Sequence, residues 1–324
     1  MTLEADAIVE RRRLRRRVSF WRIAALLLAA VAIIVLGLRL TGVGGGSKSS
    51  AHVARVELSG VILGSDTRHK MFRKLEKSHA KALLLEIDSP GGGVTASEEL
   101  YDDIRAVAAK MPVVAVIGSV AASGGYIAAL ASDHIVARQT STTGSIGVLA
   151  QYPNVTDLLS KLGVTVEEVK SAPLKAAPNG FTPTSPEARA ALKDVIMDSF
   201  AWFKSLVGER RHMSAAEVET VADGRIYTGR QALQKNLIDQ LGGDDEARAW
   251  LAKEKGVSSS LPVVDWKPSD GGWSEWGLAR SSLAGLADLA GMPVLAARIR
   301  HGATSADVQA LDGILAIWHP SLNH

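Results

Sequence analysis

Residues 113–129, VVAVIGSVAASGGYIAA, contain the passage from a strand to a helix that decides the fold. The apolar run Val113–Ile117 is typical of a strand covered on both faces, and a helix is expected to begin near Ser123. A serine on such a turn lies at the positive end of the helix dipole, and neighbouring glycines let a substrate backbone approach. The N–H of Gly124 is placed to stabilise an oxyanion. The alternative is a tight turn that only packs small residues.

Strands and helices alternate on both sides of this turn. The alternation predicts an α/β core of stacked ββα or βαβ units with largely parallel pairing. Plentiful glycine, at 30 residues, and sparse aromatics, at 5%, agree with that class. The predicted strands cover 54–58, 82–87, 113–117, 134–137 and 164–169. The predicted helices cover 66–79, 96–111, a segment that begins at 123, 183–211 and 214–221. In the helix 183–211, Ser185 is the expected N-cap and Pro186 takes the first helical position.

A second glycine-rich turn, Ser89-Pro-Gly-Gly-Gly93, follows the predicted strand 82–87. Successive glycines can present their N–H groups to an anion. A phosphate site is disfavoured because no Lys-Ser/Thr of a P-loop follows and the spacing G-x-G-x-x-G is absent. A plain flexible turn is the other alternative. Together with Ser123, the turn is best explained as the second half of an oxyanion hole.

A serine nucleophile needs a base, and the eight histidines lie in no motif that suggests one. They are predicted to be surface residues. A buried lysine can serve instead, because desolvation lowers the pKa of an ammonium group. Lys175, in the segment Val169–Lys175, has the most apolar neighbours in sequence of any lysine in the chain. From the residues alone, a solvated surface lysine remains the alternative.

The basic residues cluster at the N-terminus. Residues 1–50 hold nine Lys/Arg and three Asp/Glu, whereas the other 274 residues hold 28 and 31 and carry a net charge of −3. A nucleic-acid groove on the main body is therefore disfavoured, despite a sequence pI near 9.1. The chain has no cysteine, which excludes disulfides, a cysteine nucleophile and a thiolate metal site.

An uncharged apolar run, Ile23–Leu38, follows six arginines within residues 11–17. With Arg22 and Arg39 snorkelling, the span 19–41 is long enough to cross a membrane. The positive-inside rule places the N-terminus in the cytoplasm and the body outside, on the periplasmic side in a bacterium. The alternatives are a cleavable signal peptide and a buried soluble helix. Residues 42–50, GVGGGSKSS, form a flexible tether.

The body of the chain resembles the signal peptide peptidase A (SppA) family of membrane-anchored Ser/Lys proteases. Four segments carry the resemblance in the family's order, over about residues 52–250. They are DSPGGGV at 88–94, AASGGYIAA at 121–129, TGSIGV at 143–148 and DGRIYTGRQAL at 223–233.

The resemblance implies a crotonase-like fold, similar to that of the ClpP protease, and assembly into rings or domes that shelter the active sites. It implies Ser123 as nucleophile, Lys175 as general base and Ser145 as the residue that orients the lysine. Gly92 and Gly124 would supply the oxyanion-hole N–H groups. Lys170 competes with Lys175 for the role of base, since this loop fits the family least tightly.

The expected activity is peptide hydrolysis by a Ser/Lys dyad without cofactor or metal, acting on remnant signal peptides at the outer face of the bacterial inner membrane. A crotonase-type acyl-CoA enzyme and a non-catalytic membrane scaffold are the alternatives. The expected divisions are a basic cytoplasmic N-terminus (1–18), a transmembrane anchor (19–41), a linker (42–51), a protease domain (52–255) and a C-terminal extension of unassigned role (256–324).

Overall fold

The computed structural model of the protein describes residues 21–22, 48–268 and 315–317. The chain divides into two compact units, Met1–Ser50 and Ala51–His324. All strands and helices named below belong to the second unit.

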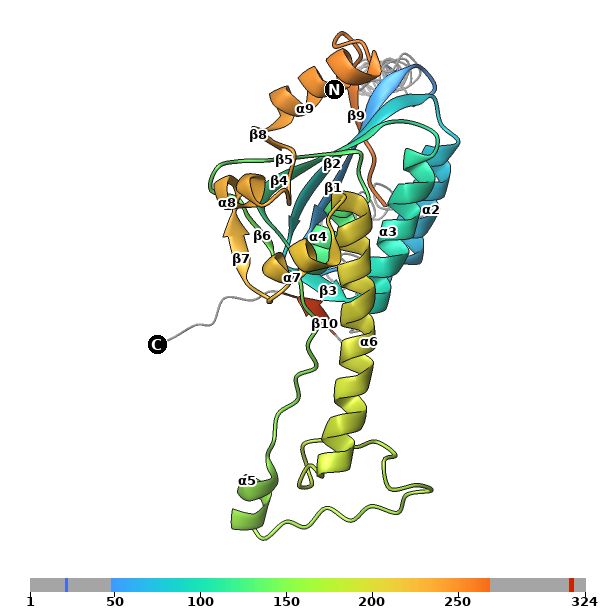
Figure 1. The fold of residues 1–324 in the computed structure, drawn as a ribbon. Helices are drawn as coiled ribbons and strands as arrows, with labels where there is room; N and C mark the ends of the chain where they lie inside the picture. Colours follow the sequence, from blue (N-terminus) through green and yellow to red (C-terminus); the bar gives the residue numbers. More distant parts are fainter. Residues whose placement is uncertain (1–20, 23–47, 269–314, 318–324) are drawn as a thin grey trace, which may run out of the picture. The chain divides into compact units, whose positions relative to one another are not determined.

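A single mostly parallel sheet forms the centre of the body (Figure 1). Its main path runs β7-β6-β4-β2-β1-β9, while β5 pairs with β4 and β8. Every pair in this sheet is parallel except β6 with β7. A separate antiparallel pair joins β3 to β10. The strands are β1 His52–Ser59, β2 Ala80–Ser89, β3 Gly91–Gly93, β4 Val113–Ala122, β5 His134–Ala137, β6 Thr142–Gly144, β7 Ile226–Thr228, β8 Gln240–Leu241, β9 Val263–Asp265 and β10 Leu315–Ile317.

Helices cover both faces of this sheet. Alternate strand residues enter two different cores: Leu83, Leu85 and Ile117 pack with α2, α3, α4 and α6, whereas Leu84 and Val116 pack with α9. The predicted burial of these strands on both faces is therefore confirmed. The helices are α2 Asp66–Glu76, α3 Val94–Ala108, α4 Gly124–Leu130, α5 Thr156–Lys161, α6 Pro186–Arg211, α7 Ala215–Val221, α8 Gly229–Gln234 and α9 Asp244–Lys255.

Helix α6 begins where its capping residues predict. The Ser185 side chain accepts a hydrogen bond from the N–H of Ala188, and Pro186 occupies the first position. The C-terminal half of α6 packs on the body, while its N-terminal half projects beyond it together with residues 150–185 (Figure 1). We call residues 150–185 the extension.

The predicted strand 164–169 is wrong. These residues lie within the extension and form no regular secondary structure. Val164, Val166 and Val169 are exposed and pair with no described strand. Alternating apolar residues predict a strand only where a neighbouring strand can satisfy the backbone, and the extension supplies none.

The prediction that all histidines lie on the surface is also wrong. His52 is fully buried at the start of β1, and its Nε2 accepts a hydrogen bond from Trp266 Nε1 at 3.1 Å. Trp266 directly follows β9, which pairs with β1. The region beyond residue 255 therefore begins with a strand of the main sheet.

Among the described residues, no helix has the length and apolar character needed to span a membrane. Apart from Trp21 and Arg22, the predicted anchor at 19–41 lies outside the described residues.

Candidate active site

Ser123 occupies a strained turn between β4 and α4. Its φ and ψ of 54° and −116° are unusual for a residue with a side chain. The turn is held on both sides: the N–H of Ser123 donates to Gly144 O at 2.8 Å, and its carbonyl accepts from Tyr126 N at 2.9 Å and Ile127 N at 3.0 Å. Strain of this kind persists because the surrounding bonds fix it, and it is typical of a nucleophile displayed at the end of a strand.

Helix α4, which follows Ser123, is completely buried. Its Tyr126 hydroxyl donates to Leu237 O at 2.8 Å, and burial raises the pKa of this phenol. Most other residues of α4 are Gly or Ala, so the helix fits closely among its neighbours. The rigid packing of α4 fixes the direction in which the Ser123 turn points.

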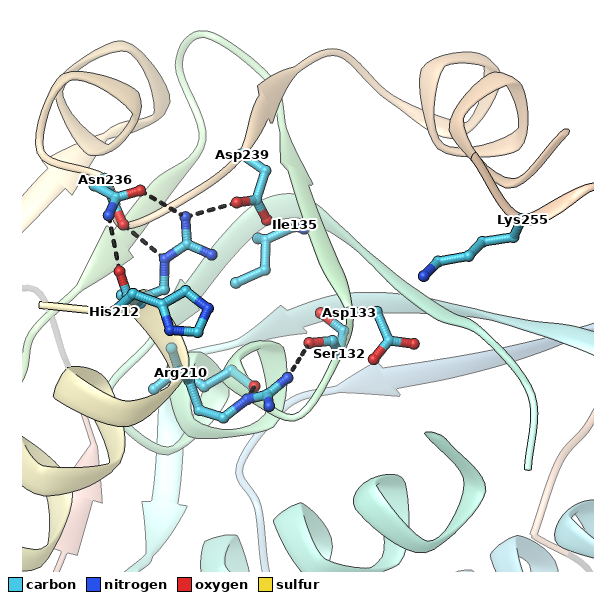
Figure 2. A pocket seen from close by; sticks show the side chains of 10 residues that line it. Ser132, Asp133, Ile135, Arg210, His212, Asn236, Asp239 and Lys255 are labelled. Atoms are coloured by element: carbon cyan, nitrogen blue, oxygen red, sulfur yellow. Dashed lines mark hydrogen bonds and ion pairs between the residues drawn. The ribbon is translucent and has the colours of Figure 1, made fainter. Parts of the chain in front are cut away.

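Two arginines at the end of α6 hold the opposite end of α4 and its surroundings. Arg210 donates to Leu130 O at 2.8 Å and to Ser132 O at 2.9 Å, satisfying carbonyls where α4 ends. The buried Arg211 donates to Asn236 O at 2.6 Å and pairs with Asp239 at 2.7 Å. These contacts line a polar pocket of about 440 Å³ (Figure 2). Both arginines are bonded to protein groups, so the residues that line the pocket hold the C-terminal end of α6 against the body, and none of them is a predicted site residue.

The two glycine-rich turns predicted from the sequence lie against one another. A Cβ on Gly125, in the first turn of α4, would come within 2.6 Å of Ser89 O. The buried Ser89 hydroxyl donates to Gly60 O at 2.7 Å and accepts from Gly91 N at 3.2 Å. Contact between these turns therefore requires glycine at 125, and the Ser89 side chain fixes its own turn to the end of β1.

Strand β3 lies between Ile62 on one edge and strand β10 on the other. Ile62 N donates to Gly91 O at 2.9 Å, and Gly93 N donates to Ile62 O at 3.1 Å. A Cβ on Gly92 would lie only 1.9 Å from Ile62 O. Since successive backbone groups of a strand point to opposite sides, the N–H and carbonyl of Gly92 face away from Ile62. The predicted oxyanion donor therefore lies on the other edge of β3.

Ser145 lies one residue beyond the carbonyl that holds Ser123. Its φ is 50°, its side chain is buried, and its N–H donates to Arg225 O at 2.8 Å. A Cβ on Gly144 would come within 2.8 Å of the Tyr227 ring. The segments 143–148 and 223–233 thus meet beside Ser123. Together with the turns at 88–94 and 121–129, all four segments of the family resemblance lie in contact around the candidate nucleophile.

The structure does not bring either candidate lysine to Ser123. Lys175 is exposed in a turn of the extension, where its N–H donates to Ala172 O. Lys170 forms an ion pair with Glu168 at 2.6 Å. In the described residues, no hydrogen bond connects Lys170 or Lys175 to Ser123 or Ser145. The serine half of the predicted site is therefore assembled within one chain, and the lysine half is not.

Apolar side chains stand exposed along the extension and the adjoining part of α6. Val169 is fully exposed, and Leu162 and Phe181 are 67% and 54% exposed. The other members are Leu158, Val164, Val166, Leu174, Val195 and Met197. A concentration of large apolar residues like this marks an interaction surface.

Sequence reasoning missed three residues that hold the site together. Ser89 fixes its glycine-rich turn to Gly60, Tyr126 fixes α4 and Arg210 satisfies the end of that helix. Of these, Ser89 and Tyr126 lie within the motifs quoted above, and their position there was the available signal. In the described parts of the chain, no three His, Asp or Glu side chains gather as a metal site.

Comparison with known proteins agrees with this arrangement. The model of peptidase family S49 matches residues 105–258, and the Clp protease model matches residues 66–143, which contain both glycine-rich turns. The chain is thus α/β and ClpP-like over that stretch. A solved structure of a ClpP1 mutant from Listeria monocytogenes aligns with 60% of this chain and 93% of its own, with a TM-score of 0.39 and 15% identity.

Two relatives match most of the described body. A putative protease of Synechocystis sp. is 39% identical over 216 residues, which cover 66% of this chain and 78% of the relative. The putative signal peptide peptidase SppA of Enterococcus faecium is 36% identical over 207 residues, which cover 63% of this chain and 60% of the relative.

Proposed function

Because this chain belongs to the serine proteases of peptidase family S49, the SppA family, we propose that it hydrolyses peptides with Ser123 as nucleophile and a lysine as base. The observation that carries the proposal is the strained turn at Ser123, which is bonded to Gly144 O and is followed by Gly125, packed against Ser89 O. No other serine of the described residues combines a left-handed φ with the start of a buried helix.

The proposed reaction follows from these groups. Neutral Lys175 removes the proton from Ser123 Oγ as the oxygen bonds to the peptide carbonyl carbon. The N–H groups of Gly92 and Gly124 hold the resulting oxyanion, and a donor of this kind typically lowers the barrier by about 2.7–4 kcal/mol. The lysine then passes its proton to the leaving amine as the C–N bond breaks. Water, activated by the same lysine, releases the acyl-enzyme.

Completion of the site by a second copy of the chain is the next part of the proposal. A lysine acts as a base only where burial removes the hydration that favours its charged form. Lys175 is exposed on an extension whose apolar side chains also lack cover in one chain. Packing the extension against a neighbouring copy would bury both together. We assign Ser145 the role of orienting the amine in that assembly.

The proposed setting is the outer face of the bacterial inner membrane. The apolar span 19–41, with arginines before it, would anchor the chain with its body on the periplasmic side. Remnant signal peptides remain in that membrane after cleavage, and we propose them as the substrates.

Fluorophosphonate labelling of the full chain tests the nucleophile and the base together. We expect the wild type to be labelled and to hydrolyse unstructured apolar peptides, whereas Ser123→Ala does neither. We expect Lys175→Ala to lower the rate of labelling and the rate of peptide hydrolysis at least a hundred-fold. Lys170→Ala is the matched control and should keep both rates. Activity of Lys175→Ala together with inactivity of Lys170→Ala would transfer the role of base to Lys170.

Mixing of inactive variants tests whether the site is shared. If Lys175 acts on Ser123 of a neighbouring copy, co-expressed Ser123→Ala and Lys175→Ala chains regain part of the activity that each lacks alone. No recovery in a mixed oligomer would place both groups in one chain. A thioesterase assay with acyl-CoA, expected to be negative, separates the protease from a crotonase-type enzyme.

A further inference from the structure

Lys175 lies in a loop of the extension whose two sides are joined by a single carboxylate. The Nδ2 of Asn179 donates a hydrogen bond to Glu168 Oε1, which connects residues 11 positions apart in the sequence. The other oxygen of the same carboxylate, Oε2, pairs with Lys170 Nζ at 2.6 Å. We call residues 168–179 the lysine loop. Lys175 thus belongs to a segment that is closed at its base.

One side of the lysine loop is fixed to the rest of the extension. Asn179 Oδ1 accepts hydrogen bonds from the N–H groups of Phe181 at 2.9 Å and Thr182 at 3.2 Å. The next residue, Gly180, is buried, and its carbonyl accepts from Val155 N at 2.9 Å. Because two separate sets of bonds hold this side, Asn179 is a fixed point against which the lysine loop closes.

Glu168 fixes the other side of the lysine loop. Within the described ranges, no hydrogen bond or ion pair except that between Glu168 and Asn179 joins residues 165–178 to a residue C-terminal of that segment or to the body. The pair with Lys170 is local, because the two residues lie within the same side of the loop. Without the bond to Asn179, ordering the segment would cost conformational entropy that no polar contact offsets.

The turn that presents Lys175 is tightly bent. The N–H of Lys175 donates to Ala172 O at 3.0 Å, and the N–H of Ala177 donates to Leu174 O at 3.2 Å. Between them, Ala176 has a φ of 54°, in the left-handed region that a residue with a side chain seldom occupies. A conformation of this kind persists only where the surrounding contacts fix it. The turn therefore depends on closure of the loop at its base.

We infer that Glu168 is a positioning residue for the proposed reaction: by closing the lysine loop, its carboxylate holds Lys175 in the geometry in which the amine meets Ser123 of a neighbouring copy. The inference rests on the proposed function for the role of Lys175, whereas closure of the loop does not require catalysis. A base must come within hydrogen-bond distance of the proton that it removes, and a displacement of about 1 Å can lower a rate about a hundred-fold. The bond to Asn179 is the essential contact, because it spans the loop.

Hydrogen exchange tests the closure without catalysis. The hosts are full-length chains that carry Ser123→Ala, and exchange of the amides of residues 169–178 is followed by mass spectrometry from milliseconds onward. We expect Glu168→Ala to speed this exchange at least five-fold, because the turn opens and its amides lose their acceptors. Glu168→Gln is the matched control, since its side-chain oxygen still accepts from Asn179 and exchange should stay near that of the parent. Equal exchange in the two variants would overturn the inference.

A kinetic comparison in the otherwise wild-type chain tests the positioning role. We expect Glu168→Ala to lower kcat for peptide hydrolysis at least ten-fold with KM little changed, because the amine is misplaced while the peptide-binding groups are intact. Glu168→Gln should keep kcat near that of the wild type. A similar loss of kcat in both variants would assign the effect to the charge of Glu168 and contradict the role of closure.

A double-variant cycle shows whether Glu168 acts through Lys175. The readout is the rate at which a fluorophosphonate labels Ser123. Glu168→Ala alone should lower this rate at least ten-fold, but added to Lys175→Ala it should cause no further loss. A further loss in the Lys175→Ala background would sink the inference. If the wild type itself is not labelled, the proposed function fails, while the exchange measurement still decides whether Glu168 closes the loop.

Discussion

The amide of Ser123 donates to the carbonyl of Gly144 at 2.8 Å, which ties the candidate nucleophile to the segment that carries Ser145. Gly144 has a φ of 87°, and a Cβ there would meet the Tyr227 ring at 2.8 Å. The position of Ser123 thus depends on a residue 21 places further along the chain where a side chain would be strained.

Gly144→Ala should disable the site more than it unfolds the protein. The added methyl group forces either the Tyr227 ring or the Gly144 carbonyl to move, and we expect kcat/KM for peptide hydrolysis to fall at least ten-fold. Strain at a left-handed position should lower the free energy of unfolding by about 1–3 kcal/mol. Gly256→Ala is the control, since its φ is 65° and no atom would lie within 4 Å of the new Cβ. Full activity in Gly144→Ala would show that this bond does not position Ser123.

Tyr126→Phe should destabilise the body by leaving a buried carbonyl without its donor. The hydroxyl of Tyr126 donates to Leu237 O at 2.8 Å in a fully buried setting. Loss of such a bond lowers the free energy of unfolding by about 1–3 kcal/mol, measured by urea denaturation. Tyr152→Phe is the matched control, because the Tyr152 hydroxyl lies 3.4 Å from Thr184 in the extension. Similar losses in the two variants would mean that burial of Tyr126 OH matters little.

Arg211→Met should cost more stability than loss of a surface ion pair. Arg211 is buried and bonds to both Asn236 O and Asp239, so its removal leaves these groups without a cation (Figure 2 shows their pocket). Removing one partner of a buried pair lowers the free energy of unfolding by about 3 kcal/mol. Arg73→Met, which breaks the exposed pair with Glu76, should cost about 0–1 kcal/mol. The prediction fails if thermal or urea unfolding ranks the two variants equally.

Glu86→Gln should remove a loss of stability that the wild type suffers as pH rises. Burial, and secondly the Asp244 carboxylate, raise the pKa of Glu86 above its ordinary value. The pKa of Glu86 is thus higher in the folded protein than in the unfolded chain. As pH rises through the range between these two pKa values, the folded state loses the advantage of binding the proton more tightly, and the free energy of unfolding falls. Urea denaturation should show Glu86→Gln more stable than the wild type at pH 7 and similar to it at pH 4. Glu254→Gln, at an exposed position of α9, should show no such difference.

Local sequence patterns predicted the central α/β elements well because each carries its own signal. The predicted strand 134–137 coincides with β5, and the Ser185-Pro186 start of α6 is confirmed by the capping bond to Ala188. The run 113–117 continues to Ala122 as β4, because the small residues that follow also pair with β6. Strand periodicity alone could not show that β4 continues from residue 117 to residue 122.

Distant contacts explain what the sequence could not predict. The buried His52 contacts Trp266, which lies 214 residues later in the sequence. No sequence pattern near His52 predicts that contact. The valines of 164–169 remain exposed because their segment projects from the body. For the same reason, the apolar neighbours of Lys175 in sequence did not make it buried. Local composition describes neighbours along the chain, whereas burial depends on neighbours in space.

The position of β9 has a consequence for the order in which the protein is made. Arg55 of β1 pairs with Asp265 of β9 across a sequence separation of 210 residues. During synthesis, β1 emerges first and keeps one unsatisfied edge until β9 has left the ribosome, and an open edge of this kind invites wrong pairing with other chains. The outer edge of β1 is therefore the last part of the main sheet to gain its partner strand, after residues 52–262 have been translated.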